Sequence, residues 1–207
     1  MKNACFISYS HSTNPYYANI VTTFAEQLGN QLALLMPKCE VYRDDDRLKP
    51  GFFPRPALAQ AICESSCMVM LFTPGYFDEG HPFCALEYLA MQGLERKRAP
   101  HLAPNVGLII PVVISGEDAM PDEVRQRKPV SLDRELLLVR DLHTRRVVEK
   151  VRGVAKQVFV LHKMLDTAAN AVAYGCQGFE FPTEQVVTPF LRRVCAQQRS
   201  QLLPSRQ

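Results

Sequence analysis

Residues 67–96 read CMVMLFTPGYFDEGHPFCALEYLAMQGLER, which is a strand-length apolar run followed by a turn and a helical pattern. The apolar run ends at Phe72, and Thr73-Pro74-Gly75 has the chemistry of a turn. Pro82 suits the first turn of a helix, where its missing N–H leaves no intrahelical bond unmade. We therefore expect a helix from Pro82 to about Arg96. Its apolar stripe consists of residues at helical spacing, namely Phe83, Leu86, Ala90, Met91 and Leu94.

The same alternation of strand and helix extends over most of the chain. The pattern predicts five strands, at residues 4–9, 40–43, 67–72, 106–114 and 135–139. Helical patterns follow these strands at residues 16–35, 55–64, 82–96 and 147–165. Such alternation is typical of βαβ units, so we expect an α/β fold with a flavodoxin-like, doubly wound parallel sheet in the order 2-1-3-4-5. Pro111 removes one ladder hydrogen bond, and we expect it near the end of its strand or at a bulge.

The length of 207 residues suits one domain with an appendage. We expect a domain over residues 1–166 and a C-terminal extension over 167–207, with one more helix near 186–197. An extension of this size is too short for a core of its own, so it either packs back on the domain or connects it to another module. No apolar run approaches the roughly 18 residues that cross a bilayer, and the apolar stretch at residues 4–9 is too short for a signal peptide. These features predict a cytoplasmic protein without membrane contact.

Charge and cysteine content exclude several classes of site. The net charge is +3, and residues 140–207 hold eleven Lys/Arg against five Asp/Glu. We interpret that excess as the solvated face of helices rather than as a nucleic-acid surface, although an acidic partner also fits it. The seven cysteines include no CxxC pair, so we expect no metal site. We expect these cysteines to be small buried thiols in a reducing compartment.

Candidate chemistry is expected at the carboxyl ends of the strands, in residues 10–15, 44–51 and 73–82. The P-loop, the Rossmann glycine fingerprint, HExxH and GxSxG are all absent from the sequence. Glu87 falls inside the apolar stripe of the helix that begins at Pro82. Periodicity alone supports two interpretations of Glu87 equally. It is either a buried carboxylate with a function, or a glutamate at the edge of the apolar stripe whose carboxylate reaches water or a basic side chain. The acidic run at 44–46 and His11 are, by themselves, ordinary loop residues.

Four segments together resemble the signatures of TIR (Toll/interleukin-1 receptor) domains over about residues 3–165. The first strand ends in Ile7-Ser8-Tyr9, and the second strand leads through Tyr42-Arg43-Asp44 to Pro50-Gly51. The third strand and its turn are followed by Phe83-Cys84-Ala85-Leu86-Glu87, and the fourth strand contains Ile110-Pro111-Val112. Each motif alone is weak, but their order and spacing are specific.

The resemblance implies which residues form the site. Family members include NAD⁺-cleaving enzymes, in which the glutamate at the position of Glu87 is essential, and non-catalytic scaffolds. It implies a catalytic Glu87, with NAD⁺ as substrate and no cofactor, and substrate contacts from Tyr9, Ser10, His11, Asp46, Arg47 and Phe83. It also implies an assembly loop that includes Asp44, Asp45, Lys49, Pro50 and Gly51. Phe83 replaces the Trp of the family, which leaves a smaller ring face without an N–H donor.

We therefore expect an NAD⁺ glycohydrolase that releases nicotinamide and leaves ADP-ribose or a cyclic isomer. The resemblance implies that it works on self-association in prokaryotic immune or cell-death signalling, with the extension serving a sensor domain or sensor chain. Two alternatives stay open from the sequence. One is a scaffold that signals by homotypic contact, and the other is a nucleoside-processing enzyme on a similar sheet.

Overall fold

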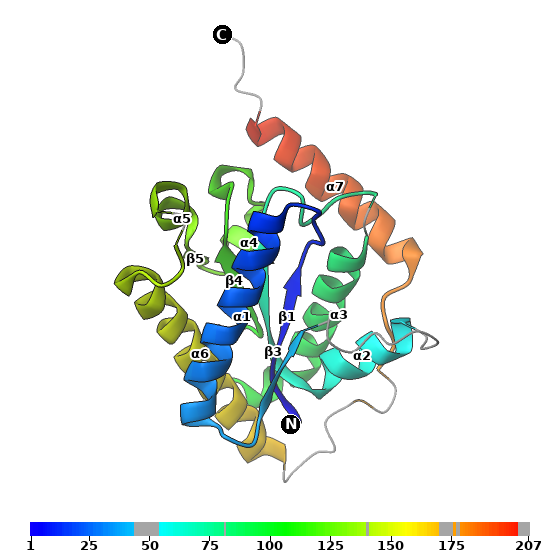
Figure 1. The fold of residues 1–207 in the computed structure, drawn as a ribbon. Helices are drawn as coiled ribbons and strands as arrows, with labels where there is room; N and C mark the ends of the chain where they lie inside the picture. Colours follow the sequence, from blue (N-terminus) through cyan, green and yellow to red (C-terminus); the bar gives the residue numbers. More distant parts are fainter. Residues whose placement is uncertain (44–53, 81, 140, 170–175, 177–178, 203–207) are drawn as a thin grey trace.

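The computed structural model describes residues 1–43, 54–80, 82–139, 141–169, 176 and 179–202. Their strands form one parallel sheet in the order β2-β1-β3-β4-β5 (Figure 1). The strands are β1 (Asn3–Tyr9), β2 (Glu40–Arg43), β3 (Ser65–Phe72), β4 (Ile109–Val113) and β5 (Val130–Ser131). The α/β fold and the strand order predicted from the sequence are confirmed.

Helices cover both faces of this sheet. Helices α1 and α6 pack together on one face, whereas α2 and α3 pack on the other (Figure 1). Both central strands, β1 and β3, are consequently buried along their whole length. No helix in the described ranges is long and apolar enough to span a membrane. The helices are α1 (Pro15–Leu35), α2 (Pro54–Glu64), α3 (Phe83–Arg98), α4 (Asp122–Arg125), α5 (Asp133–Val139), α6 (Arg145–Ala169) and α7 (Glu184–Leu202).

The predicted last strand at residues 135–139 is wrong, because these residues belong to helix α5. The edge strand is the two-residue β5, which lies just upstream. Residues 136–138 are all Leu, which is unbranched at Cβ and favours a helix over a strand. Asp133 and Glu135 in the first turn also stabilise α5 by opposing its dipole. An apolar run alone did not distinguish the two structures.

Pro111 lies in the middle of β4, not at an end or a bulge as predicted. Neighbouring residues show why the sheet tolerates it. The Leu108 carbonyl and the Ile114 amide bond to β3, whereas the Val113 carbonyl accepts from Leu132, just after β5. By this alternation the backbone nitrogen of Pro111 faces the β5 side, where pairing starts only at Val112. No ladder bond to β3 is lost.

The C-terminal helix α7 packs back on the domain. Val187, Phe190, Leu191 and Val194 are buried in the same core cluster as the sheet residues. Figure 1 shows α7 (orange to red) crossing near the amino end of α3. Of the two arrangements that the sequence left open, packing against the domain is the one observed.

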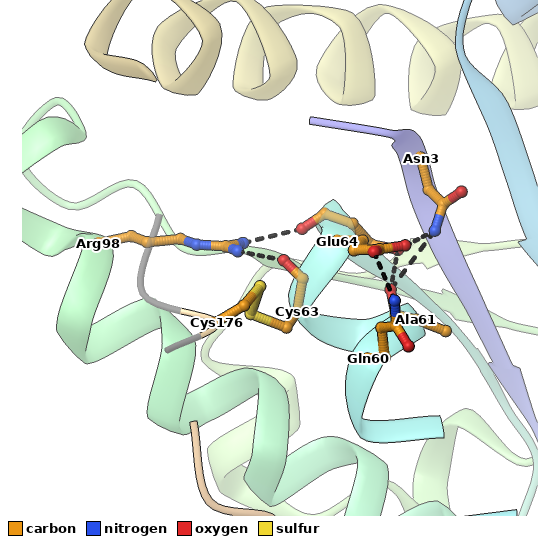
Figure 2. The surroundings of a disulfide bond; sticks show 8 residues. Asn3, Gln60, Ala61, Cys63, Glu64, Arg98 and Cys176 are labelled. Carbon is orange, nitrogen blue, oxygen red and sulfur yellow. Dashed lines mark hydrogen bonds between the residues drawn. A yellow bond between two sulfur atoms is a disulfide. The ribbon is translucent and has the colours of Figure 1, made fainter. Parts of the chain in front are cut away.

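A disulfide joins Cys63, at the end of α2, to Cys176, which precedes α7 (Figure 2). The Arg98 guanidinium lies beside it and donates to the carbonyls of Cys63 at 2.6 Å and Ser65 at 2.8 Å. The expectation that all seven cysteines are free thiols is therefore wrong for this pair. The other five are not part of this disulfide and are thiols, and Cys5, Cys67, Cys84 and Cys195 are buried.

Candidate functional site

A pocket of about 380 Å³ opens where the chain leaves β1 and β3. Its lining comes from residues just after β1, the start of α1, the loop after β3 and the first turn of α3. It therefore occupies the carboxyl edge of the sheet, which is where ligands bind in open α/β folds. The volume is at the small end of the roughly 300–1,000 Å³ range of ligand pockets.

Four hydroxyl-bearing residues line this pocket, and hydrogen bonds join three of them: Ser10, Tyr17 and Thr73, with Ser12 as the fourth. The Ser10 hydroxyl donates to Tyr17 Oη at 3.4 Å, and Thr73 Oγ1 lies 3.2 Å from Ser10 Oγ. Because the single proton of Ser10 is directed to Tyr17, Thr73 is the donor in the second bond. Burial raises the pKa of Tyr17 to about 12, so this phenol keeps its proton at neutral pH. The pocket thus offers neutral hydroxyls that suit sugar and phosphate oxygens.

Aromatic side chains provide the apolar surface near the pocket. Phe83 is 50% exposed and lines the pocket together with His11. The ring centroid of His11 is 5.2 Å from that of Tyr9, which is itself buried. A half-exposed ring of this kind can pack against a planar heterocycle.

Glu87 is not among the residues that line the pocket. Its side chain is only 5% exposed. Phe83 and Cys84, one turn earlier on α3, share its helix face and do line the pocket. Glu87 therefore lies one helical turn from the pocket lining, on the same face of α3.

The Glu87 carboxylate ends a chain of buried hydroxyls. Its Oε2 accepts a hydrogen bond from Ser8 Oγ, and Ser8 Oγ lies 2.5 Å from Tyr76 Oη. Because Ser8 donates to Glu87, Tyr76 donates to Ser8. The pKa of Tyr76 is well above its ordinary value, mainly through burial and further through the nearby Cys84 and Glu87. Both protons thus point toward the carboxylate, as hydrogen bonding to an anion requires.

The structure brings together part of the predicted site. Ser10, His11 and Phe83 line one pocket, with the Tyr9 ring against His11 and Glu87 buried one helical turn after Phe83. The remaining predicted positions lie outside the described residues: Asp44, Asp45, Asp46, Arg47, Lys49, Pro50 and Gly51.

A larger groove of about 990 Å³ lies between α3, the region entering β4, and α6. Glu95 and Arg127 in this groove form an ion pair at 2.8 Å, and Glu95 also accepts from the Leu108 amide at 2.6 Å. The groove is near the amino end of β4, and none of the described residues that line it was predicted for the site. We therefore assign the candidate site to the smaller pocket, whose lining on α3 is one helical turn from the buried Glu87.

The sequence signature of the TIR domain family matches residues 5–143. This chain belongs to the TIR domain family. The match covers the whole pocket lining and Glu87, and it ends before α6 and α7. No curated protein matches the chain at a significant level.

Among solved structures, the TIR domains of the activated Roq1 resistosome, which directly recognises the pathogen effector XopQ, are similar to this chain. The alignment covers 90% of this chain and 98% of that chain, at 20% sequence identity and a TM-score of 0.37. With similarity this low, the family assignment depends on the signature match alone.

Thr73, Tyr76 and Asp78 lie in the predicted segment 73–82, although none of them was singled out. Thr73 and Asp78 line the pocket of this TIR domain, and Tyr76 and Ser8 hold Glu87. Tyr17 also lines the pocket but lies outside the predicted segments. Tyr17 had no signal, because the first turn of α1 reaches the pocket only through the packing of that helix on the sheet.

The described residues contain no group of three or more His, Cys, Asp and Glu that could hold a metal ion. The side chains at and near the pocket are one buried carboxylate, neutral hydroxyls, an exposed ring and the rim carboxylate of Asp78, which accepts from the Gly80 amide at 2.9 Å.

Proposed function

We propose that this TIR domain is an NAD⁺ nucleosidase that uses Glu87 to cleave the bond between nicotinamide and ribose. The observation that carries the proposal is a carboxylate at 5% exposure, hydrogen-bonded by Ser8 and one helical turn from residues that line a pocket at the carboxyl edge of the sheet. Burial of such a group is costly, so its retention in the core favours a role beyond packing. The family includes both NAD⁺-cleaving enzymes and scaffolds, so the residues decide between them.

One carboxylate is enough for this reaction. Nicotinamide in NAD⁺ is a cationic substituent, and it departs as a neutral molecule when the C1′–N bond breaks with both electrons going to nitrogen. The leaving group therefore needs no general acid. The ribosyl fragment gains positive charge at C1′ as the bond breaks, and the Glu87 carboxylate stabilises that charge. Water then adds at C1′ and loses a proton, or a nucleophile within the molecule adds to form a cyclic isomer.

The pocket lining supports binding of one half of a dinucleotide. The hydroxyls of Ser10, Tyr17 and Thr73 suit ribose or phosphate oxygens, and Phe83 offers a ring face. Helix α1 begins at Pro15 beside this wall, so its positive end lies close to where a phosphate would sit. Because the pocket is small, the rest of the substrate must contact other surfaces. We propose that a second copy of the domain supplies them.

The proposal extends to cellular context. We place the enzyme in the cytoplasm, in a prokaryotic immune or cell-death response that consumes NAD⁺ or produces a nucleotide signal. The extension beyond residue 166, whose helix α7 packs on the domain, then also presents a surface to a sensor domain or sensor chain. These statements depend on the family resemblance and on the proposed activity.

The experiment is nicotinamide release at high protein concentration, comparing wild type with Glu87→Gln. The substitution keeps size and hydrogen bonding but removes the charge, so we expect a loss of ~10²-fold or more in kcat. Glu149→Gln is the matched control, because it makes the same change at an exposed ion pair on α6, outside the pocket and the elements that hold Glu87. Its activity per folded molecule should stay close to wild type. A Glu87→Gln protein that is folded and as active as wild type would refute the assignment.

A second candidate is a non-catalytic TIR scaffold. Two observations favour it: the Glu87 carboxylate already accepts a hydrogen bond from Ser8, and Glu87 does not line the pocket. A polar contact that only stabilises the fold would have both properties. A scaffold would associate with itself but release no nicotinamide from NAD⁺ at any protein concentration. The release assay, run alongside light scattering, separates the two candidates. Parallel assays with free nucleosides test the nucleoside-processing alternative.

A further inference from the structure

Helix α7 lies against the loop at residues 73–80, which carries part of the pocket wall. Two hydrogen bonds join them: Cys195 Sγ donates to the Phe77 carbonyl at 2.9 Å, and Gln198 Nε2 donates to the Pro74 carbonyl at 3.3 Å. An ion pair between Arg199 and Glu79 at 3.5 Å adds a third contact. These contacts fall on both sides of Tyr76, so α7 fixes the backbone around that residue.

The Phe190 side chain of α7 packs against the neighbours of both Tyr76 and Glu87. Its ring centroid lies 5.4 Å from that of Phe77, edge to face, and 5.7 Å from that of Tyr88, in a stacked arrangement. Phe77 follows Tyr76 in the loop, and Tyr88 follows Glu87 in α3. Phe190 is only 7% exposed, so it fills the space between the loop and the helix.

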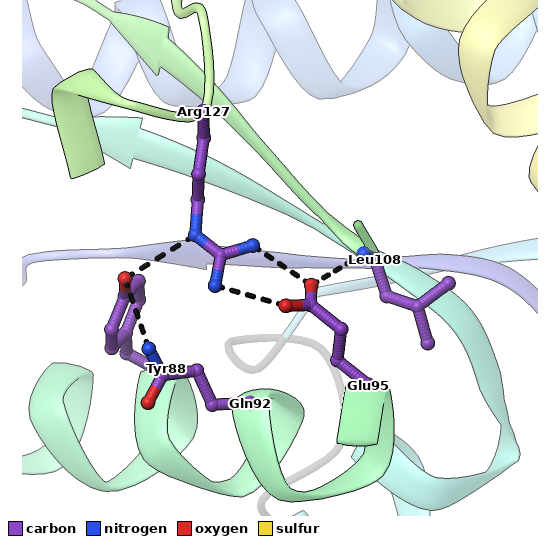
Figure 3. Close-up of polar contacts among 5 residues, drawn as sticks. All are labelled: Tyr88, Gln92, Glu95, Leu108 and Arg127. Carbon is purple, nitrogen blue, oxygen red and sulfur yellow. Dashed lines mark hydrogen bonds and ion pairs between the residues drawn. The ribbon is translucent and has the colours of Figure 1, made fainter. Parts of the chain in front are cut away.

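Tyr88 is held from its other side as well. Figure 3 shows its hydroxyl accepting hydrogen bonds from Arg127 Nε and Gln92 Nε2, each at 3.4 Å. Arg127 is in turn paired with Glu95 through two bonds of 2.8 and 3.1 Å. The Tyr88 side chain is therefore held in place on α3. We expect a substitution of Phe190 to displace the 73–80 loop rather than α3.

We propose that α7 is a positioning element of the site, and this inference rests on the proposed function. It holds the 73–80 loop so that the Tyr76 hydroxyl, through Ser8, fixes the orientation of the Glu87 carboxylate. Tyr76 is fully buried, and its hydroxyl can reach Ser8 only while the loop stays in place. Phe190 and Tyr76 act through Glu87 and are positioning residues. A loop without this support would open locally at small energetic cost.

The Cys63–Cys176 disulfide supports the same arrangement. It anchors the segment that precedes α7 to the end of α2, so α7 is kept at high effective concentration near the loop. Cys176→Ser should therefore weaken, but not abolish, the support that α7 gives to the 73–80 loop. In that variant, we expect Gln198→Ala to reduce kcat more than it does with the disulfide intact.

The test is a double-mutant cycle on kcat and KM for nicotinamide release, using Tyr76→Phe and Phe190→Leu. Tyr76→Phe removes only the hydroxyl, and Phe190→Leu keeps an apolar side chain so that the fold survives. Each should lower kcat roughly tenfold to hundredfold with little change in KM, because misplacement of a catalytic group has that effect. If α7 acts through Tyr76, Phe190→Leu should have almost no further effect in the Tyr76→Phe background. Val186→Ala, at an exposed site on α7, is the control and should leave kcat unchanged.

Hydrogen–deuterium exchange of peptides covering residues 73–80 gives a readout independent of activity. We expect faster exchange in Phe190→Leu than in wild type or Val186→Ala. Additive losses in kcat, or unchanged exchange in this loop, would overturn the positioning role. An inactive wild type whose loop still loses protection in Phe190→Leu would instead refute the proposed function and leave α7 as the element that holds the loop.

Discussion

At the scale of single residues, Phe83 is where the site departs most clearly from its family pattern. The ring replaces a Trp, lines the pocket and is 50% exposed. A side chain this exposed contributes little to the core. Removing the Phe83 ring should therefore affect substrate binding more than the stability of the fold.

We expect Phe83→Ala to raise KM severalfold for nicotinamide release while the melting temperature changes by only a few degrees. Phe83→Trp should keep kcat and lower KM, because the larger ring offers more contact area. Steady-state kinetics with thermal denaturation measure both effects. If KM is the same in wild type, Ala and Trp variants, the ring does not contact the substrate.

The position of Glu87 in an apolar stripe was visible in the sequence, and the structure buries it. Its partners were not predictable, because Ser8 is 79 positions away along the chain and Tyr76 reaches the carboxylate only through Ser8. Periodicity reports which face of a helix is buried. It does not report which polar group from another strand or loop meets that face.

At the scale of secondary-structure elements, His162 links α6 to the sheet. Its Nδ1 lies 2.7 Å from Ser66 Oγ on β3, and its Nε2 lies 3.4 Å from Cys39 Sγ. The pKa of His162 is lowered from 6.5, mainly by burial and further by the N-terminal ammonium group. The folded state thus favours the neutral imidazole.

This shift predicts lower stability in acid. Between the folded and the unfolded pKa, the unfolded chain binds more protons, so the free energy of unfolding falls as pH falls. The loss should begin near pH 6.5, the ordinary value of the imidazole, and level off below the folded pKa. Melting temperatures from pH 8 to pH 5 should show a shallower decline in His162→Gln than in wild type. His101→Gln, at a partly exposed position, should decline like wild type, and equal slopes in all three proteins would contradict the prediction.

The elements that were predicted correctly either have apolar residues at a regular helical spacing or are strands that helices cover on both faces. Strand β3 and helix α3 are examples, since one is a continuous apolar run and the other has a regular stripe. The edge was harder to predict. Strand β5 is two residues long, which is too short for any repeating pattern, and the Leu-rich segment of α5 beside it imitates a strand.

At the scale of the whole molecule, the small pocket and the uneven charge bear on self-association. The sequence holds eleven Lys/Arg against five Asp/Glu after residue 139, while residues 44–46 are all Asp. If a second copy completes the site, specific activity should rise with protein concentration. Added salt should reduce it, because exposed charges are screened beyond about 8 Å at physiological ionic strength.

Initial rates over a wide dilution series, together with light scattering, measure this dependence. Arg47→Glu combined with Lys49→Glu should suppress activity, and circular dichroism should show that each chain remains folded. The matched control is Lys38→Glu, at an exposed position just before β2 and outside the basic region after residue 139. A monomer with constant specific activity would mean that each site is complete by itself.

The disulfide could not be predicted at any scale from the sequence. Seven cysteines without a paired spacing leave the connectivity open, and Cys63 and Cys176 meet only because the chain returns to α2 after α6. The domain and the segment before α7 are thereby joined across a sequence separation of 113 residues.

This bond turns the middle of the polypeptide into a covalent ring that contains Glu87 and Tyr76. A protease that cuts once inside the ring opens it but releases no fragment, so both nicked pieces stay together until the bond is reduced. A cut outside the ring, between Cys176 and α7, leaves the C-terminal helix held only by its noncovalent contacts with the domain. Cleavage in the ring therefore keeps both pieces covalently joined, whereas cleavage in the short segment before α7 lets the helix that holds the 73–80 loop dissociate.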